Sequence, residues 1–328
     1  MYVLGVDVAK KKLDVCLLDP ETDQRRSKTV PNTRAGFAAR RDWLLGQKVP
    51  DLSQVHLVLE AAGVYPEAVA LWFFAAGAAI SVGNPAPIEA FGQGLAIRPK
   101  TAARDRQGLA RYGALVQPPR WQPPAPEGRE LQALIARLDA VAADRRREQN
   151  RQEQAEVVPM PPPVAESLTQ HLDFLNAEAP RLQTALPEHI DRHPGLRQDR
   201  DLPRSIPAVG EKTAQRLLAL LQSRDFQSAD QVTAFLGLVP VECRSGSRLH
   251  RRPRLAKAGA PCLRAALYMA AVVATRHNPH LQALHERLLA RGNAKMAALG
   301  AAMRKLVQLA FGVLNHQQPY QANWAPTS

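Results

Sequence analysis

Two short apolar segments that each carry a carboxylate at or beside their last residue most constrain the fold of this 328-residue chain. The first covers residues 3–8 and carries Asp7, and the second covers residues 55–60 and ends at Glu60. Short runs of valine and leucine bounded by turn-forming residues are typical of buried strands. Because an unpaired carboxylate in apolar surroundings is strongly disfavoured, two such strand ends predict a shared positive partner. A hard divalent cation held by oxygen ligands fits this role best.

The N-terminal third alternates strand and helix patterns. Strand patterns cover residues 3–8, 13–18, 26–31, 55–60 and 79–83, and helical patterns cover residues 34–46 and 65–76. The first strands follow one another across a lysine-rich turn at residues 10–12, whereas the later strands are separated by helices. Antiparallel strands followed by βαβ units predict a mixed α/β domain, which we assign to residues 1–118.

The middle of the chain, residues 119–200, reads as a linker followed by a coiled-coil region. The proline-rich residues 117–128 favour the linker, and helical patterns begin at residue 129 and again after the prolines of residues 159–163. Two helices around a proline-rich turn predict an antiparallel hairpin. Pro180 is expected to kink or split the second helix.

The last part, residues 201–328, reads as a mostly α-helical domain. Its alanine- and leucine-rich helical patterns cover residues 262–276, 279–290 and 294–315. A turn at residues 206–210 leads into another helix and resembles a helix-hairpin-helix motif, although Ala208 stands where the first glycine belongs. Such a turn presents backbone N–H groups to a phosphate, and Lys212 is a further candidate for DNA binding. The alternative is an ordinary helix start after a glycine turn.

The net charge of +13 predicts a polyanionic partner, and nucleic acid fits this better than a membrane surface. The aromatic fraction of 5% does not favour extended base stacking. The sequence contains no run of eighteen uncharged apolar residues, so we expect no membrane span. The first residues have the pattern of a strand rather than that of a signal peptide. The expected location is the cytoplasm.

A third carboxylate, Asp105, lies in a helical pattern three residues after Ala102, so residues 102 and 105 share one helix face. With an acid at position 102, the set would form a four-carboxylate site of the kind that holds two divalent metals during phosphoryl transfer. A single aspartate at a strand end is as often a structural or helix-capping residue as a functional one. The prediction of a metal site therefore rests on Asp7, Glu60 and Asp105 together.

A serine next to glycine, Ser245, lies within a basic cluster. A serine there is suited to attack a phosphodiester, because arginines clamp phosphate oxygens and stabilise developing charge. Composition alone favours an ordinary loop serine, and Ser247 competes for the nucleophile role. The basic residues that we expect to contact nucleic acid are Arg244, Arg248, Arg251, Arg252, Arg254 and Lys257.

Taken together, these stretches resemble the bridge-RNA-guided DEDD transposases of bacterial insertion sequences, the insertion-sequence 110 family. The resemblance covers both ends of the chain and is weakest over residues 120–200. The matching stretches are residues 5–10, 59–65, 84–85, 100–105, 109–112, 206–210, 235–240, 245–246, 257–259 and 263–268.

The resemblance implies a RuvC-like (RNase H-like) N-terminal domain, a coiled-coil insertion and a C-terminal transposase domain. It implies that Asp7, Glu60 and Asp105 bind Mg²⁺ and that Ser245 forms a covalent phosphoserine link with DNA. The implied partners are double-stranded donor and target DNA and a structured noncoding guide RNA. It also implies a homo-oligomer, a dimer or a tetramer of paired dimers, acting at the bacterial nucleoid.

Ala102 departs from this family pattern, in which an acid stands at that position. Leu109 to Tyr112 follow Asp105 at the family spacing, so the register is correct. An alanine cannot bind metal, so the chain is either a deliberately inactivated variant or a natural member with a weakened site. Arg106, where the family has a small residue, is a second departure. Two other functions stay open: a metal-dependent structure-specific nuclease, such as a Holliday-junction resolvase, and a non-catalytic nucleic-acid-binding protein.

Overall fold

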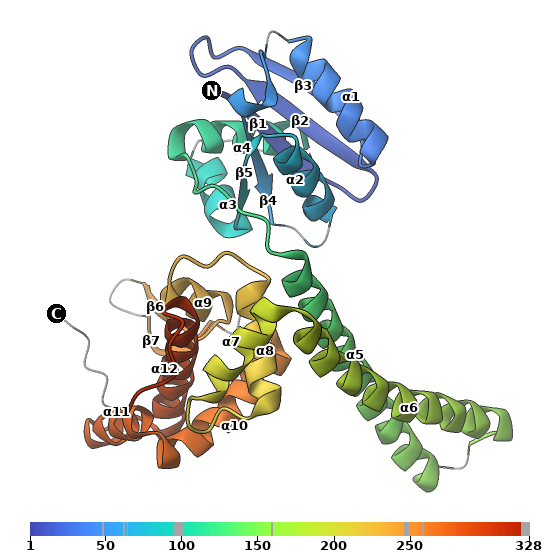
Figure 1. Cartoon of the computed structure of the whole chain (residues 1–328), viewed down its shortest axis with the longest axis vertical. Coiled ribbons are helices and arrows are strands. Elements are labelled where there is room, and N and C mark those ends of the chain that lie inside the picture. Colours follow the sequence, from blue (N-terminus) through green and yellow to red (C-terminus); the bar gives the residue numbers. More distant parts are fainter. Residues whose placement is uncertain are drawn as a thin grey trace. The chain divides into compact units, whose positions relative to one another are not determined.

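The computed structural model describes residues 1–47, 49–61, 63, 65–94, 102–158, 160–245, 249–256 and 259–322. These residues form two compact units, Met1–Pro123 and Pro124–Ser328 (Figure 1).

A mixed sheet forms the centre of the N-terminal unit. Its strands are β1 (Tyr2–Val8), β2 (Lys12–Leu18), β3 (Arg25–Pro31), β4 (Val55–Glu60) and β5 (Ala79–Gly83). They lie in the order β3-β2-β1-β4-β5, with β1–β2 and β2–β3 antiparallel and β1–β4 and β4–β5 parallel. The helices of this unit are α1 (Arg34–Leu45), η1 (Leu52–Gln54), α2 (Tyr65–Ala75), α3 (Pro85–Gly94) and α4 (Ala102–Val116). The mixed α/β prediction is confirmed.

Alternating side chains give this sheet two buried faces. Leu4 and Val6 of β1 pack in a core that includes Phe37 of α1 and Phe73 of α2. On the other face, Val3 of β1 packs with Cys16, Val58 and Ile88 and with Leu109 and Ala110 of α4. The sheet is therefore covered by α1 and α2 on one side and by α3 and α4 on the other.

Gly5 of β1 sets how closely α4 approaches the sheet. A Cβ atom at Gly5 would lie 2.3 Å from the Arg106 carbonyl oxygen and 2.4 Å from the Ala110 nitrogen. Both atoms belong to the α4 backbone, so they cannot turn away as a side chain does. A residue without a side chain is required where the helix backbone rests directly on the strand.

The predicted linker at residues 117–128 is ordered where it leaves the N-terminal unit. The Trp121 N–H donates a 2.6 Å hydrogen bond to the Ile80 carbonyl of β5. The Ser81 hydroxyl lies within hydrogen-bonding distance of the carbonyl oxygens of Pro118 (3.0 Å) and Pro119 (2.8 Å). This segment therefore packs along β5, and the next helix already begins at Pro126.

The C-terminal unit begins with a helical hairpin of α5 (Pro126–Val157) and α6 (Pro162–Arg192), which lie side by side (Figure 1). Val141 packs against Leu175, Ala179 and Leu182 between them. The predicted antiparallel hairpin is confirmed. Of the two outcomes expected at Pro180, a kink or a split, the split is wrong, because α6 continues unbroken from Pro162 to Arg192. Pro180 is exposed, and the apolar face of α6 continues past it against α5, so packing outweighs the lost backbone hydrogen bond.

A helical bundle completes this unit. It contains α7 (Pro194–Arg204), α8 (Glu211–Gln222), α9 (Ala229–Phe235), α10 (Pro261–His277), α11 (Pro279–Ala290) and α12 (Lys295–Asn315). By length and composition α12 could span a membrane. Its residues Met303, Leu306 and Val307 are nevertheless buried in the core that it shares with the other helices of the bundle.

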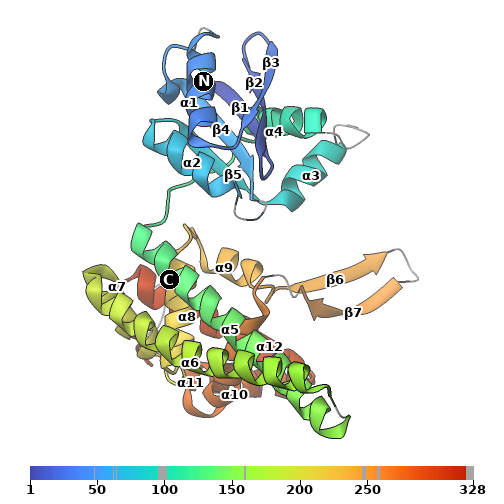
Figure 2. The same ribbon diagram turned by 90° about the vertical axis from the view of Figure 1, so that its right-hand side faces the viewer.

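A β-hairpin that the sequence analysis did not predict extends away from these helices (Figure 2). Strand β6 (Pro240–Ser245) pairs antiparallel with β7 (Leu249–Leu255), and Ser245 stands opposite Leu249. The interpretation of Ser245 as a loop residue is wrong, because its backbone belongs to the last position of β6. The strand pattern is hidden because arginines and prolines replace the apolar residues by which a strand is usually identified.

Candidate active site and nucleic-acid interface

The period of two along each strand places three carboxylates on the sheet face that α4 covers. In β1, Val3 and Gly5 face α4, and Asp7 follows at the same parity. In β4 and β2, the same step leads from Val58 to Glu60 and from Cys16 to Asp14. Asp7 and Glu60 are half-buried, whereas Asp14 is buried.

Strand pairing brings these carboxylates to one edge of the sheet. Asp7 and Asp14 are direct partners in the β1–β2 ladder. Because Val6 pairs with Leu59 in the parallel β1–β4 ladder, Asp7 of β1 and Glu60 of β4 lie at the same level on neighbouring strands. The carboxyl ends of parallel strands are where α/β sheets commonly carry their functional groups.

Asp105 reaches this edge through the close contact of α4 with β1. It lies in the first turn of α4, one residue before Arg106, whose carbonyl rests over Gly5. Asp7 is two residues further along β1, and the negative charge of Asp105 acts on it directly. The N-terminal turn of a helix is also a favourable position for a carboxylate.

The electrostatic environment of Asp7 fits a cation. Burial raises the pKa of Asp7, and the negative charges of Asp105 and Asp14 raise it further, while Lys12 and Arg106 act in the opposite direction. A divalent cation among these oxygen atoms would relieve the mutual repulsion of Asp7 and Asp105, and such hard ligands are those that Mg²⁺ prefers. The carboxylates of Asp7, Glu60 and Asp105 therefore fit a divalent metal.

Asp14 is the residue of this site that the sequence analysis missed. It is 4% exposed, and its carboxylate lies 2.7 Å from Lys12 Nζ and 3.3 Å from Arg106 Nη1. The Thr29 hydroxyl also donates to it. Burial alone would raise the pKa of Asp14, but the hydrogen bonds and the nearby positive charges outweigh burial and lower it.

Asp14 therefore stays ionised and holds the Arg106 guanidinium at the acidic edge. This guanidinium offsets part of the negative charge that would otherwise attract a metal ion. The sequence did contain a signal for Asp14: in the predicted hairpin of residues 3–8 and 13–18, the pairing that sets Val8 opposite Leu13 also sets Asp7 opposite Asp14.

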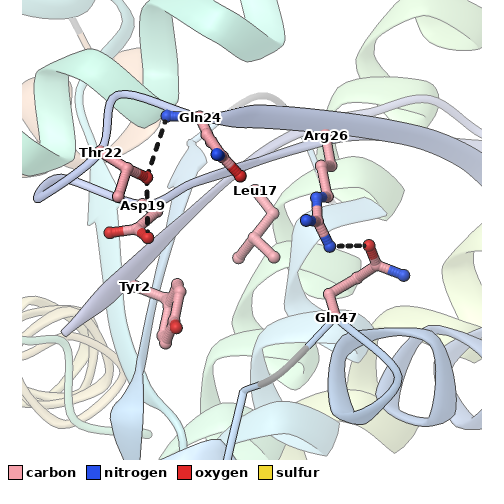
Figure 3. Close-up of a pocket in the computed structure, with 7 residues that line it drawn as sticks. All are labelled: Tyr2, Leu17, Asp19, Thr22, Gln24, Arg26 and Gln47. Atoms are coloured by element: carbon pink, nitrogen blue, oxygen red, sulfur yellow. Dashed lines mark hydrogen bonds between the residues drawn. The ribbon is translucent and has the colours of Figure 1, made fainter.

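The pocket shown in Figure 3 lies at the opposite end of the sheet from the carboxylates. It is lined by Tyr2 at the start of β1 and by Leu17 and Arg26 of β2 and β3. Its polar groups bond to one another: the Thr22 hydroxyl donates to Asp19 over 2.9 Å, and Arg26 donates to Gln47. We therefore regard it as part of the β2–β3 connection and not as the candidate active site.

The candidate nucleophile and the basic residues belong to the C-terminal unit. Ser245 is the last residue of β6 and stands opposite Leu249 of β7. Arg244 pairs with His250 in the backbone ladder, and Arg251 and Arg252 lie in β7; the side chains of these residues and of Ser245 lie outside the described part of the structure. Arg254 is exposed, whereas Arg248, Ser247 and Lys257 lie outside the described residues.

The turn that resembles a helix-hairpin-helix motif joins α7 to α8. The Val209 N–H donates a 3.0 Å hydrogen bond to the Ile206 carbonyl, and Ala208 has a φ of 77°. Proline at the second position and a positive φ at the third are features of a type II turn. Gly210 then precedes the first turn of α8, where Lys212 is exposed.

Replacing Ala208 with glycine is expected to stabilise the C-terminal unit. An L-residue at positive φ costs about 1–2 kcal/mol, and the greater freedom of glycine in the unfolded chain offsets about 0.5–1 kcal/mol of that gain. The midpoint of urea unfolding should therefore rise. In the control Ala283→Gly, an exposed site within α11, the free energy of unfolding should fall by the helix-propensity difference of about 1 kcal/mol, and the midpoint should fall with it. A lower midpoint for Ala208→Gly would contradict the strained turn.

Comparison with known proteins identifies the family. Residues 4–155 match the transposase family model of the DEDD type of IS110 elements, and residues 201–286 match the model described as Transposase IS116/IS110/IS902 family. The pilin gene-inverting proteins of Moraxella lacunata and Moraxella bovis are each 30% identical over 319 residues, which cover 97% of this chain and 97% of each relative. The chain belongs to the IS110 family of transposases.

As an IS110-family transposase, the protein is a DNA recombinase, and the family expected from the sequence is confirmed. The DEDD match spans β1 to β5 and α4, and so includes Asp7, Glu60 and Asp105 and indicates the use of a divalent metal. The second match includes the turn at Ala208 and the β6–β7 hairpin. The two models leave residues 156–200 unmatched, within the stretch where the sequence resemblance is weakest.

Proposed function

We propose that this IS110-family transposase recombines double-stranded DNA under the guidance of a structured noncoding RNA, through a covalent phosphoserine intermediate. The observation that carries the phosphoryl-transfer chemistry is the meeting of Asp7, Glu60 and Asp105 at one edge of the N-terminal sheet. The guide RNA and the serine nucleophile are proposed from the family resemblance. The strand order β3-β2-β1-β4-β5 further supports a RuvC-like assignment of this unit. A set of carboxylates at such an edge fits a role in phosphoryl transfer better than it fits a role in simple DNA binding.

The acidic edge would hold Mg²⁺ through the carboxylates of Asp7, Glu60 and Asp105. When bound, the metal supplies stabilisation of the negative charge that develops on phosphate oxygens. Asp14 would not serve as a ligand, because Lys12, Arg106 and Thr29 already occupy its carboxylate. Its proposed role is to orient Arg106 beside Asp105.

Ser245 would be the nucleophile. Its Oγ would form an ester bond with the DNA phosphorus while the bond from phosphorus to one DNA oxygen breaks, and the departing strand leaves as a hydroxyl carrying a proton. Attack on that ester by a hydroxyl of another strand joins the new ends and restores the serine. Arg244, Arg248, Arg251, Arg252, Arg254, Lys257 and Lys212 would contact nucleic-acid phosphates.

The partners follow from charge and exposed surface. A net charge of +13 supports salt-dependent binding to DNA and RNA backbones, so base pairing with the guide RNA would supply sequence recognition. Exposed apolar side chains on the helical hairpin, Val157, Val164 and Phe174, support its role in forming a dimer or tetramer. The protein would act at the nucleoid. The name of the Moraxella relatives indicates inversion of a gene, a rearrangement in which DNA strands are cut and rejoined.

A strand-transfer assay with purified protein, the cognate element ends, the target DNA and the noncoding RNA tests this function. We expect Mg²⁺-dependent recombination and a protein–DNA adduct that survives denaturation, both lost when the RNA is omitted. Cleavage without any adduct would identify a structure-specific nuclease instead. Tight binding without cleavage under any divalent metal, even after Ala102→Asp, would identify a non-catalytic binding protein. Either result overturns the proposal.

Replacing Ala102 with aspartate is expected to raise metal-dependent activity. Residues 102 and 105 are three apart on α4, so the new carboxylate would join the face that carries Asp105. Groups that merely support a metal ligand change affinity or activity by about 10–100-fold, so a direct ligand should contribute at least tenfold. Strand transfer measured against Mg²⁺ concentration should rise and reach half its maximum at lower Mg²⁺.

The matched control is Ala103→Asp, which adds the same charge one residue further on, away from that helix face. It should leave the Mg²⁺ dependence unchanged. Equal curves for the parent and for Ala102→Asp would count against a four-carboxylate site in this chain.

A further inference from the structure

A second group of metal-ligating side chains lies in the C-terminal unit, at the base of the helical hairpin. It consists of Glu130 near the start of α5, His189 near the end of α6, and His193, which lies between α6 and α7. One ligand atom from each residue lies within 4.8 Å of the other two. These residues belong to neither the acidic edge nor the β6–β7 hairpin.

The hydrogen bonding of His189 fixes which ring nitrogen is available. Its side chain is buried, and Nε2 lies 2.9 Å from the Glu127 carbonyl oxygen. A carbonyl only accepts, so Nε2 carries the proton and donates it. In the neutral ring, Nδ1 then presents its lone pair, and Nδ1 lies 3.7 Å from the Glu130 carboxylate. Metal-ligating histidines almost always donate their other N–H to a carbonyl or carboxylate in this manner.

A lone pair that faces a carboxylate is repulsive unless a cation or a proton stands between them. The second histidine favours a metal ion, because the His193 ring lies 4.6 Å from the His189 ring, centroid to centroid, and brings another nitrogen ligand to the same point. Two imidazoles and one carboxylate form a ligand set for Zn²⁺ or a similar transition metal, whereas Mg²⁺ prefers oxygen ligands alone.

The geometry needs only a small adjustment. Ligands about 2.0–2.1 Å from a tetrahedral zinc ion lie about 3.3 Å apart, so no pair of the three groups needs to approach by more than about 1.5 Å. The His189 Nδ1 atom and the Glu130 carboxylate, 3.7 Å apart, are already close to that spacing. Glu130, whose side chain is 68% exposed, and the half-buried His193 have room to move, whereas the buried His189 is the fixed member. Three protein ligands leave the fourth position to water.

We propose that Glu130, His189 and His193 bind a transition-metal ion of the Zn²⁺ class, which fastens the base of the helical hairpin to α7. The site borders a core in which Leu131 of α5 packs with Leu186 and Ile190 of α6 and Leu196 of α7. The metal would therefore join elements that already pack together, and binding would stabilise the folded C-terminal unit.

Thermal unfolding and calorimetric titration of the metal-free full chain with ZnCl₂ test this site. Zinc at a hundredfold excess over its Kd should raise the melting temperature by about 5 °C or more. MgCl₂ should not reproduce the shift. Glu130→Gln and His193→Gln each remove one ligand at an exposed or half-buried position, so both variants should fold and should each weaken zinc binding at least tenfold.

His171→Gln is the matched control, because His171 Nδ1 lies 3.5 Å from Glu148 in the same helical hairpin. This variant should keep the full zinc response. An equal response in the double variant Glu130→Gln/His193→Gln would overturn the proposal by placing the bound zinc elsewhere. A melting temperature that changes with pH but not with zinc would identify a protonated His–Glu pair and would also overturn it.

Discussion

Replacing Ser245 with alanine is expected to abolish the covalent protein–DNA adduct and to reduce strand transfer by at least about a thousandfold. Loss of a catalytic nucleophile removes the covalent route itself, and losses of 10³ or more are usual in enzymes that form such intermediates. The measurement is adduct formation on a denaturing gel with labelled DNA ends, with strand transfer quantified in the same samples.

The matched control for that variant is Ser247→Ala, two residues further on and also next to Gly246. It should keep both the adduct and strand transfer. DNA binding by Ser245→Ala should match the parent, because the arginines of the hairpin are unchanged. If the adduct persists in Ser245→Ala and disappears in Ser247→Ala, the nucleophile is Ser247.

The Gly5→Ala variant is expected to lose both stability and activity. The new methyl group would lie 2.3 Å from the Arg106 carbonyl oxygen and 2.4 Å from the Ala110 nitrogen, so α4 must move away from β1. Overpacking of this kind typically costs about 1–3 kcal/mol, which urea unfolding measures directly. Because α4 carries Asp105, the movement also separates Asp105 from Asp7, and a misplacement of about 1 Å can cost a hundredfold in rate.

Gly108→Ala is a stringent control for Gly5→Ala, since Gly108 lies on the same helix and a Cβ there would meet no atom within 4 Å. It should keep full activity and gain about 0.5–1 kcal/mol of stability from the better helix propensity of alanine. If Gly5→Ala unfolded at the same urea concentration as the parent, the direct contact of α4 with the sheet would be wrong.

The sheet could be predicted from the sequence because its apolar strands have clear ends. Asp7 and Glu60 stood out as the polar ends of such strands, and parallel pairing brings them together. Asp14 was missed, because it lies near the start of its strand and not at a strand end. The role of Asp14 in the site depends on its pairing with Asp7 and on its contact with Arg106, which lies 92 residues away in sequence.

The β6–β7 hairpin could not be predicted by the same reasoning. An alternation of apolar and polar residues identifies a strand that has one face in a core. Strand β7 lacks this alternation, because it carries Arg251, Arg252 and Arg254. Its pairing comes from the backbone ladder, which leaves no hydrophobic signature. Ala208 shows the opposite case: the sequence marked it as a departure from a glycine, and its positive φ shows why a glycine fits that turn.

The pairing of Asp7 with Asp14 makes the length of the β1–β2 turn part of the candidate active site. The Ala9 N–H bonds to the Lys12 carbonyl over 3.0 Å and closes this turn, which sets every rung of the ladder behind it. An insertion or deletion of a single residue would shift the register, and a one-residue slip turns a strand's side chains to the opposite face of the sheet. Asp14 would then leave Asp7, and Arg106 would lose its anchor, although every charged residue were still present.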